Sequence, residues 1–154
     1  MDSLFLETAV VGSQKPFNVP LLDFSSGKSV LLWGPSGIGK TAYVRSHFSK
    51  PLCCNGLKQL LRLTSDNDGI IFDWADFTEV RSFHWMPLLE PGDKTVYVTP
   101  RKFLRIPASL PIVFVHVVKD FFFDSSSKDK LFVSLLRQFV DERLMVYHVS
   151  DQLF

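Results

Sequence analysis

The sequence lacks a net charge of either sign, because 17 Lys and Arg residues balance 16 Asp and Glu residues in a chain of 154. A chain this close to neutral cannot hold nucleic acid through its overall field, so any such site must be a local basic patch. Disorder is excluded as well, since hydrophobic residues make up 46% of the chain and 15 residues are Phe. The length and composition predict one folded domain.

Cysteine is scarce, and the two cysteines, Cys53 and Cys54, are neighbours whose geometry opposes a mutual disulfide. We therefore expect a reducing, intracellular setting, either cytoplasm or nucleus. Residues 1–14 hold no basic run ahead of an apolar segment, so they do not predict secretion. The longest apolar run, residues 110–118, has about half the length of a membrane-spanning helix. No membrane association is expected.

Short apolar runs rich in β-branched and aromatic residues alternate with segments of helical period, which predicts an α/β fold. Strands are expected at residues 29–33, 51–54, 70–72, 111–118 and 145–149. Helices are expected at residues 39–47, 56–63, 77–85 and 128–144, the last with Leu131, Val133, Leu135, Leu136 and Val140 facing the core. Residues 1–28 are expected to form an N-terminal lead-in segment, and residues 29–154 the domain itself.

Residues 34–41 match the phosphate-loop pattern of Gly, four residues of any type, Gly, Lys and Ser or Thr. The motif lies between an expected strand and an expected helix, which is the context that such a loop requires. Its glycines let consecutive N–H groups point into one concavity, and the helix start adds partial positive charge. Lys40 would reach the β and γ phosphates of ATP or GTP, and the Thr41 hydroxyl would ligate Mg²⁺. The expected nucleotide-binding residues are Gly34, Pro35, Ser36, Gly37, Ile38, Gly39, Lys40 and Thr41.

A nucleotide bound with Mg²⁺ also needs a carboxylate near the loop, and Asp73 directly follows the apolar run 70–72. Asp73 lies 33 positions after Lys40, which leaves room for a helix, a strand and a second helix between them. Asp73 is therefore the expected second Mg²⁺ ligand. Asp76 is a further catalytic candidate beside Lys40 and Asp73, although it could equally cap the helix expected from Phe77.

Basic residues gather in segment 94–106, where alternating residues and a break at Pro100 predict a β-hairpin. The stretch from Lys94 to Arg105 contains no Asp or Glu, and the aromatic residues Tyr97 and Phe103 are interleaved with the cations. This pattern is typical of a hairpin that follows a DNA backbone and stacks on bases, although a solvated basic face has the same pattern. The expected DNA-binding residues are Lys94, Arg101, Lys102 and Arg105.

With these motifs in this order, residues 29–116 resemble the superfamily-3 helicase domain of Rep initiators, which replicate circular single-stranded DNA viruses and related plasmids. Besides the phosphate loop, the resemblance rests on Ile-Ile-Phe-Asp-Trp-Ala-Asp-Phe at 70–77, on segment 88–105, and on Ile-Pro-Ala-Ser-Leu-Pro-Ile-Val-Phe at 106–114. It implies an AAA+-like P-loop NTPase, with a parallel central sheet flanked by helices and a basic β-hairpin before the sensor strand. It also implies a ring of subunits that hydrolyses ATP to move single-stranded DNA within a host cell.

The sequence departs from this family in three ways. Trp74 stands where most members have a second acid, so the catalytic base is missing or has moved to Asp76. Val117 stands where the sensor strand usually ends in Asn, which leaves His116 as the substitute. The four histidines never stand two positions apart, so the metal pair of the family's nuclease is absent. The first two departures weaken hydrolysis more than binding.

Two other functions fit the same residues. Loss of hydrolysis, which Trp74 and Val117 favour, would leave a nucleotide-dependent interaction or scaffold module. A small-molecule or nucleoside kinase would keep the loop but would need a basic lid, whereas the basic cluster of this chain precedes a strand. Two residues have open roles: Arg137 is either an arginine finger or a surface residue, and His116 is either catalytic or a core histidine.

Overall fold

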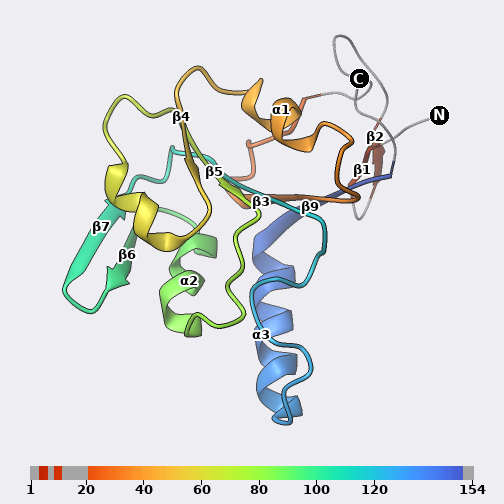
Figure 1. The fold of residues 1–154 in the computed structure, drawn as a ribbon, viewed down its shortest axis with the longest axis vertical. Coiled ribbons are helices and arrows are strands. Elements are labelled where there is room, and N and C mark those ends of the chain that lie inside the picture. Colours follow the sequence, from red (N-terminus) through yellow and green to blue (C-terminus); the bar gives the residue numbers. More distant parts are fainter. Residues whose placement is uncertain (1–3, 7–8, 12–20, 151–154) are drawn as a thin grey trace.

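Five parallel strands form the centre of a seven-stranded sheet in the computed structural model, which describes residues 4–6, 9–11 and 21–150 (Figure 1). The order along the sheet is β2-β1-β9-β3-β8-β5-β4. The parallel strands are β3 (Ser29–Trp33), β4 (Pro51–Cys54), β5 (Gly69–Asp73), β8 (Ile112–His116) and β9 (Leu144–Val149). The N-terminal segment adds β1 (Leu4–Leu6) and β2 (Ala9–Val11), which extend the sheet antiparallel beside β9. The α/β fold predicted from the sequence is confirmed.

The central strands β3, β5 and β8 are buried along nearly their whole length, because helices pack on both faces of the sheet. Their apolar runs are therefore continuous rather than alternating. Strand β8 ends two residues earlier than predicted, since the N–H groups of Val117 and Val118 both donate to the ring of His116. The chain leaves the sheet at that point.

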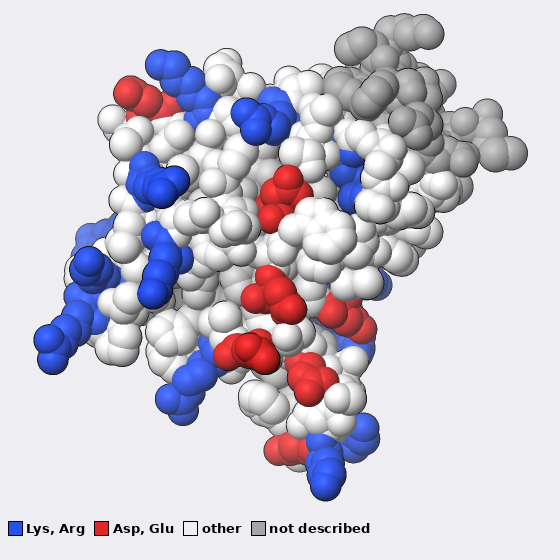
Figure 2. All heavy atoms as spheres, in the orientation of Figure 1, with Lys and Arg blue, Asp and Glu red and all other residues white. Residues whose placement is uncertain are grey.

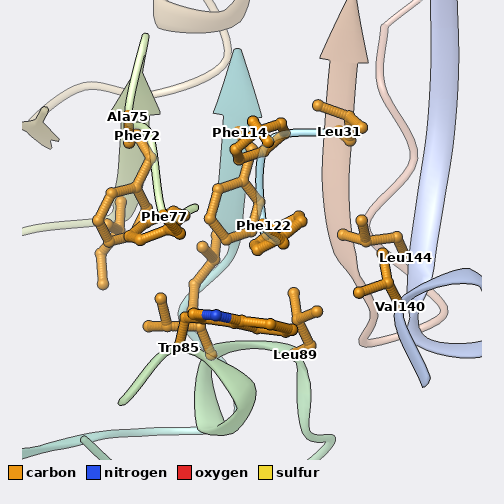
Figure 3. Packing of buried hydrophobic residues seen from close by; sticks show 14 of the residues in the cluster. Leu31, Phe72, Ala75, Phe77, Trp85, Leu89, Phe114, Phe122, Val140 and Leu144 are labelled. Carbon is orange, nitrogen blue, oxygen red and sulfur yellow. The ribbon is translucent and has the colours of Figure 1, made fainter. Parts of the chain in front are cut away.

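The larger core lies on the face covered by α2 (Ser82–Leu89) and α3 (Lys130–Arg143). Figure 3 shows Phe72 and Phe114, from neighbouring strands, meeting Phe77 and Phe122 above Trp85 of α2. The ring centroids are 5.2 Å apart for Phe72 and Phe114, and 5.6 Å apart for Phe77 and Phe122. Burial of each such ring contributes about 1.5–3 kcal/mol to folding. This cluster anchors the segments that follow β5 and β8.

A smaller core on the opposite face fixes α1 (Lys40–Arg45), the helix that follows the phosphate loop. Tyr43 and Val44 of this helix are fully buried and belong to the same cluster as Ile71 and Val115. The sequence prediction placed the helix over 39–47, and the structure ends it two residues earlier. Packing of α1 against β5 and β8 holds the end of the loop over the edge of the sheet.

Helix α2 begins five residues later than the predicted span 77–85 and continues through Pro87 to Leu89, so the predicted bounds were wrong. The reason is local: Asp76 accepts hydrogen bonds from the N–H and hydroxyl of Thr78 and forms a turn there instead of a helix. The predicted helix at 56–63 is a 3-10 helix, η1 (Leu57–Arg62).

Helix α3 buries a narrower stripe than predicted. Leu136 and Val140 face the core, whereas Leu131 is 72% exposed and Leu135 is 56% exposed. The prediction that these two leucines point inward was wrong, because a period of 3.6 residues places them opposite the stripe of Leu136 and Val140. Figure 1 shows the N-terminal part of α3 extending away from the sheet.

The predicted hairpin is present as β6 (Lys94–Thr99) and β7 (Lys102–Ile106), which form a separate antiparallel pair with a register shift between Tyr97 and Thr99. Alternation along β6 directs Val96 and Val98 into the core. The outer face of the pair carries Tyr97 and Phe103 opposite each other.

Candidate nucleotide site

The phosphate-loop segment passes between the ends of β8 and β9, and only glycine fits at its first position. The N–H of Gly34 donates to the carbonyl of His116 at 3.1 Å, and a Cβ added to Gly34 would lie 2.1 Å from the carbonyl oxygen of Val149. Gly37 and Gly39 have φ values of +79° and +93°, which residues with side chains rarely adopt. The glycines of the motif are therefore required by the backbone conformation of the loop and by its close approach to β9.

Lys40 lies inside the loop. Its side chain is nearly buried, and Nζ donates to the carbonyl oxygens of Gly34 at 2.9 Å and Pro35 at 2.5 Å. Burial lowers the pKa of Lys40, while the negative charge of Asp73 acts in the opposite direction. A cation surrounded by oxygen acceptors at this position could exchange carbonyl oxygens for phosphate oxygens.

Thr41 and Asp73 are 32 residues apart in the chain and meet at the edge of the sheet. The Thr41 hydroxyl donates to Asp73 Oδ2 at 3.0 Å. The other oxygen, Oδ1, is buried and has no hydrogen-bond partner among the described residues. A buried carboxylate oxygen without a partner is costly, and a hydrated divalent cation would satisfy it.

This donor set fits Mg²⁺, which prefers hard oxygen ligands and keeps several waters. Thr41 and Asp73 would hold the ion, together with phosphate oxygens. Within the described part of the chain, no cluster of three His, Cys, Asp or Glu residues could hold a metal ion alone. That finding is compatible with an ion bound through one carboxylate and a nucleotide.

Trp74 has an unusual backbone conformation, with a φ of +61°, and its N–H donates to the carbonyl of Val115 at 2.9 Å. A bulky residue in this region costs about 1–2 kcal/mol. The indole is 55% exposed, and its ring lies 5.4 Å from that of His116. No sequence pattern signals this conformation, because neighbouring strands impose it.

His116 ends β8 beside the loop and is nearly buried. Its Nδ1 accepts from the N–H groups of Val117 and Val118, so the neutral ring carries its proton on Nε2. The ring stacks on Phe121 at 4.7 Å. Burial lowers the pKa of His116, against the opposing charge of Asp76. Of the two roles considered for His116, these contacts fit that of a core histidine, and the residue lies at the edge of the site.

Asp76 and Arg137 both have partners within the chain. Asp76 is exposed, and its hydrogen bonds from Thr78 lower its pKa. Arg137 Nη1 lies 3.0 Å from both carboxylate oxygens of Asp120. Arg137 therefore forms an ion pair with Asp120 at the surface of the same chain.

The basic hairpin presents three of its four predicted cations to solvent, namely Arg101, Lys102 and Arg105. Lys94 differs, because it is only 8% exposed and its Nζ donates to the carbonyl of Gly92 at 3.2 Å. Burial also lowers the pKa of Lys94. Figure 2 shows basic side chains gathered over the hairpin, at the left of the view, with acidic side chains nearer the middle.

No protein-family model matches the chain, and no curated protein matches it. Among residues 4–6, 9–11 and 21–150, no helix combines the length and the apolar character that crossing a membrane requires.

Proposed function

We propose that this chain is the ATP-binding domain of a Rep-like DNA replication protein, an AAA+-like P-loop NTPase of the superfamily-3 helicase type. Lys40, Thr41 and Asp73 form its nucleotide and Mg²⁺ centre. The observation that carries the proposal is the Thr41–Asp73 hydrogen bond, beside the buried and unpartnered Oδ1 of Asp73. The bond joins the loop to the one acid that the sequence singled out as a metal ligand.

The arrangement of the sheet supports the same proposal. Strand β8 lies between β3, which leads into the loop, and β5, which ends in Asp73. All three strands are parallel, so their carboxyl ends meet at one edge. Open α/β sheets bind ligands outside the carboxyl ends of their strands.

The side chains at this edge are better suited to binding than to hydrolysis. Indole nitrogen only donates, so Trp74 cannot accept a proton. His116 Nδ1 already accepts two N–H groups, and the low pKa of Asp76 makes its carboxylate a weak base. Bound Mg²⁺ would neutralise charge on the phosphates, but none of the described side chains at this edge is arranged to activate water. We therefore propose slow turnover, which keeps a nucleotide-dependent interaction module as the second candidate function.

Single-stranded DNA is the proposed partner. The support is the exposed set of Arg101, Lys102 and Arg105, next to the Tyr97 and Phe103 rings, whose centroids are 5.3 Å apart. Self-association into a ring belongs to the same proposal, and sedimentation with and without nucleotide tests it.

Lys40→Ala tests the nucleotide site by calorimetric titration with ATP and Mg²⁺. Loss of charge-assisted hydrogen bonds should weaken ATP binding by about 100-fold or more. The fold should persist, because the Lys40 ammonium contacts loop carbonyls rather than the apolar core. Lys58→Ala, at an exposed position on η1, is the matched control and should bind normally. Equal ATP affinity in Lys40→Ala and wild type would refute the proposal.

A further inference from the structure

Aromatic rings continue from the hairpin onto the first turn of α2. Tyr97 and Phe103 face each other across the hairpin, and the carbonyl of Tyr97 accepts a hydrogen bond from His84 Nδ1 at 2.7 Å. The His84 ring lies 4.0 Å from that of Phe83, which is 57% exposed. The guanidinium of Arg81 lies 5.7 Å from the Phe83 ring. The half-buried His84 therefore joins the hairpin backbone to the exposed ring of Phe83 and the cation Arg81, and this row leads away from the hairpin.

This row ends at a pocket of about 430 Å³ between α2 and α3. Phe83 and Arg81 belong to both the row and the pocket lining. Two of the aromatic residues in its lining, Phe83 and Phe132, are exposed, whereas Trp85, Phe122 and Phe123 are buried behind them. A pocket of this size, with two exposed rings among five polar or charged lining residues, suits a planar aromatic ligand that has polar edges.

The charges around the pocket favour an anionic chain that stays on the Arg81 side. Arg81 is exposed at the start of α2, next to the Phe83 ring. Among the described residues that line the pocket, Asp124 is the one carboxylate, and it is held by the N–H of Ser126 at 3.0 Å and its hydroxyl at 2.6 Å. Phosphates would be attracted by Arg81 and repelled by Asp124, whereas an uncharged ring could enter beside the exposed aromatic residues.

We infer that this pocket binds one unpaired nucleobase of single-stranded DNA, whose phosphates follow Arg81 and the hairpin cations Arg101, Lys102 and Arg105. The inference rests on the DNA partner in the proposed function. An apolar protein segment suits the site less well, because the cation Arg81 lies in the pocket lining beside the exposed Phe83 ring, and His84 of the same helix is hydrogen-bonded to the hairpin. The base would stack on Phe83 while the backbone remains in solvent.

The test compares a fluorescent single-stranded oligonucleotide with a matched oligonucleotide that carries abasic positions but the same phosphates. In wild type, loss of the bases should weaken binding about 5- to 100-fold, as measured by fluorescence anisotropy. Val133→Phe, which fills the pocket, and Phe83→Ala, at an exposed ring, should both reduce this ratio without changing the salt dependence. Leu131→Ala is the control at an exposed α3 position and should keep the ratio.

The outcomes separate the two proposals. If the ratio is equal in wild type and both pocket variants, the base pocket is refuted, while DNA binding through the hairpin survives. If filling the pocket changes only the oligomeric state, the pocket is a protein interface and the inference is again overturned. If wild type binds neither oligonucleotide, the proposed DNA partner fails together with the inference. Thermal unfolding of each variant confirms that the fold is retained.

Discussion

At the scale of single residues, Trp74 is the side chain that most affects the chemistry expected at the nucleotide site. It directly follows Asp73, its φ is +61°, and its indole lies against the His116 ring. Strained residues of this kind persist where surrounding structure holds them, often at functional sites. The indole occupies the place next to Asp73 and offers no proton acceptor. A nucleotide bound here would thus meet a bulky side chain that cannot activate water.

Trp74→Glu should raise ATP turnover by roughly 10- to 100-fold, since a positioned base contributes typically about 10²–10⁴-fold. Both residues carry a Cβ, so the cost of the positive φ is unchanged. Release of phosphate at saturating ATP is the measurement. Trp74→Gln is the matched control, because the Gln amide is similar in size to the Glu carboxylate but is not a base. Equal rates in the Glu and Gln variants would mean that the missing base does not limit turnover.

Two histidines, the half-buried His47 and the buried His116, predict how stability depends on pH. His47 Nε2 accepts from the N–H of Leu22 at 2.8 Å while Nδ1 donates to the carbonyl of Tyr43, and His116 Nδ1 accepts from Val117 and Val118. Burial lowers the pKa of both rings, so unfolded chains bind more protons as pH drops below about 6.5. The free energy of unfolding should be highest above that pH and fall below it.

Chemical denaturation at pH 7.5, 6.5 and 5.5 measures this dependence. His47→Gln should reduce the slope, because a Gln amide can donate and accept without titrating. The carboxylates whose pKa values are lowered, such as Asp76, act only below about pH 4 and do not contribute in this window. A stability that is constant from pH 7.5 to 5.5 would contradict the prediction.

At the scale of elements, the phosphate loop depends on how strands β8 and β9 end. Gly34 touches both: its N–H bonds to His116, and its Cα faces the carbonyl of Val149. Gly37 has open space around it and a φ of +79°, so its requirement is conformational rather than steric. Gly34 and Gly37, two glycines of the same motif, are therefore required for different physical reasons.

Gly34→Ala should destabilise the fold by about 3 kcal/mol, because backbone on β9 must move to admit a Cβ. Gly37→Ala should cost only about 1–2 kcal/mol, from the left-handed conformation alone. Gly56→Ala is the control, since Gly56 has open space and an extended φ of −167°. Urea denaturation measures the free energy of unfolding of the three variants and so ranks their stabilities. A Gly34 variant as stable as the Gly56 variant would show that β9 does not restrict the loop.

At the scale of the whole molecule, a net charge of +1 leaves the hairpin as the basic patch that could hold an anionic chain. It lies on the same face of the sheet as α2 and α3, whereas α1 lies on the other. The large aromatic core lies between the candidate nucleotide site and the hairpin, since Phe72 and Phe114 of the sheet and Val96 of the hairpin all belong to it. Such a packed core is stiff, which would favour coupling between the two sites.

The salt dependence of DNA binding should reflect three hairpin cations and not four, because Lys94 is nearly buried. With about 0.7 counterion released per phosphate of a single strand, the hairpin alone predicts a slope of log affinity against log salt near −2, and a phosphate on Arg81 as well brings it to about −3. The combined variant Arg101→Ala and Arg105→Ala should flatten the slope by about 1.4 in either case. Arg45→Ala, on the exposed side of α1, is the control and should leave the slope unchanged. Fluorescence anisotropy across a salt series checks this, and identical slopes in all three proteins would mean that the hairpin is a solvated face.

Local sequence determined the features that a few neighbouring residues can specify. Gly37 and Gly39 define their own backbone conformations, the apolar runs of β3, β5 and β8 require burial, and alternation across Pro100 defines the hairpin. These features were predicted correctly from the residues alone, because each depends on interactions over a few positions.

Tertiary structure decided the features that depend on residues far apart in the chain. The hydrogen bond between Thr41 and Asp73, the positive φ of Trp74 and the burial of Lys94 all follow from which strands and loops become neighbours. The outward direction of Leu131 and Leu135 follows from which stripe of α3 meets the core. No local pattern contains this information, since a side chain's surroundings are set by contacts that form only when the whole sheet has assembled.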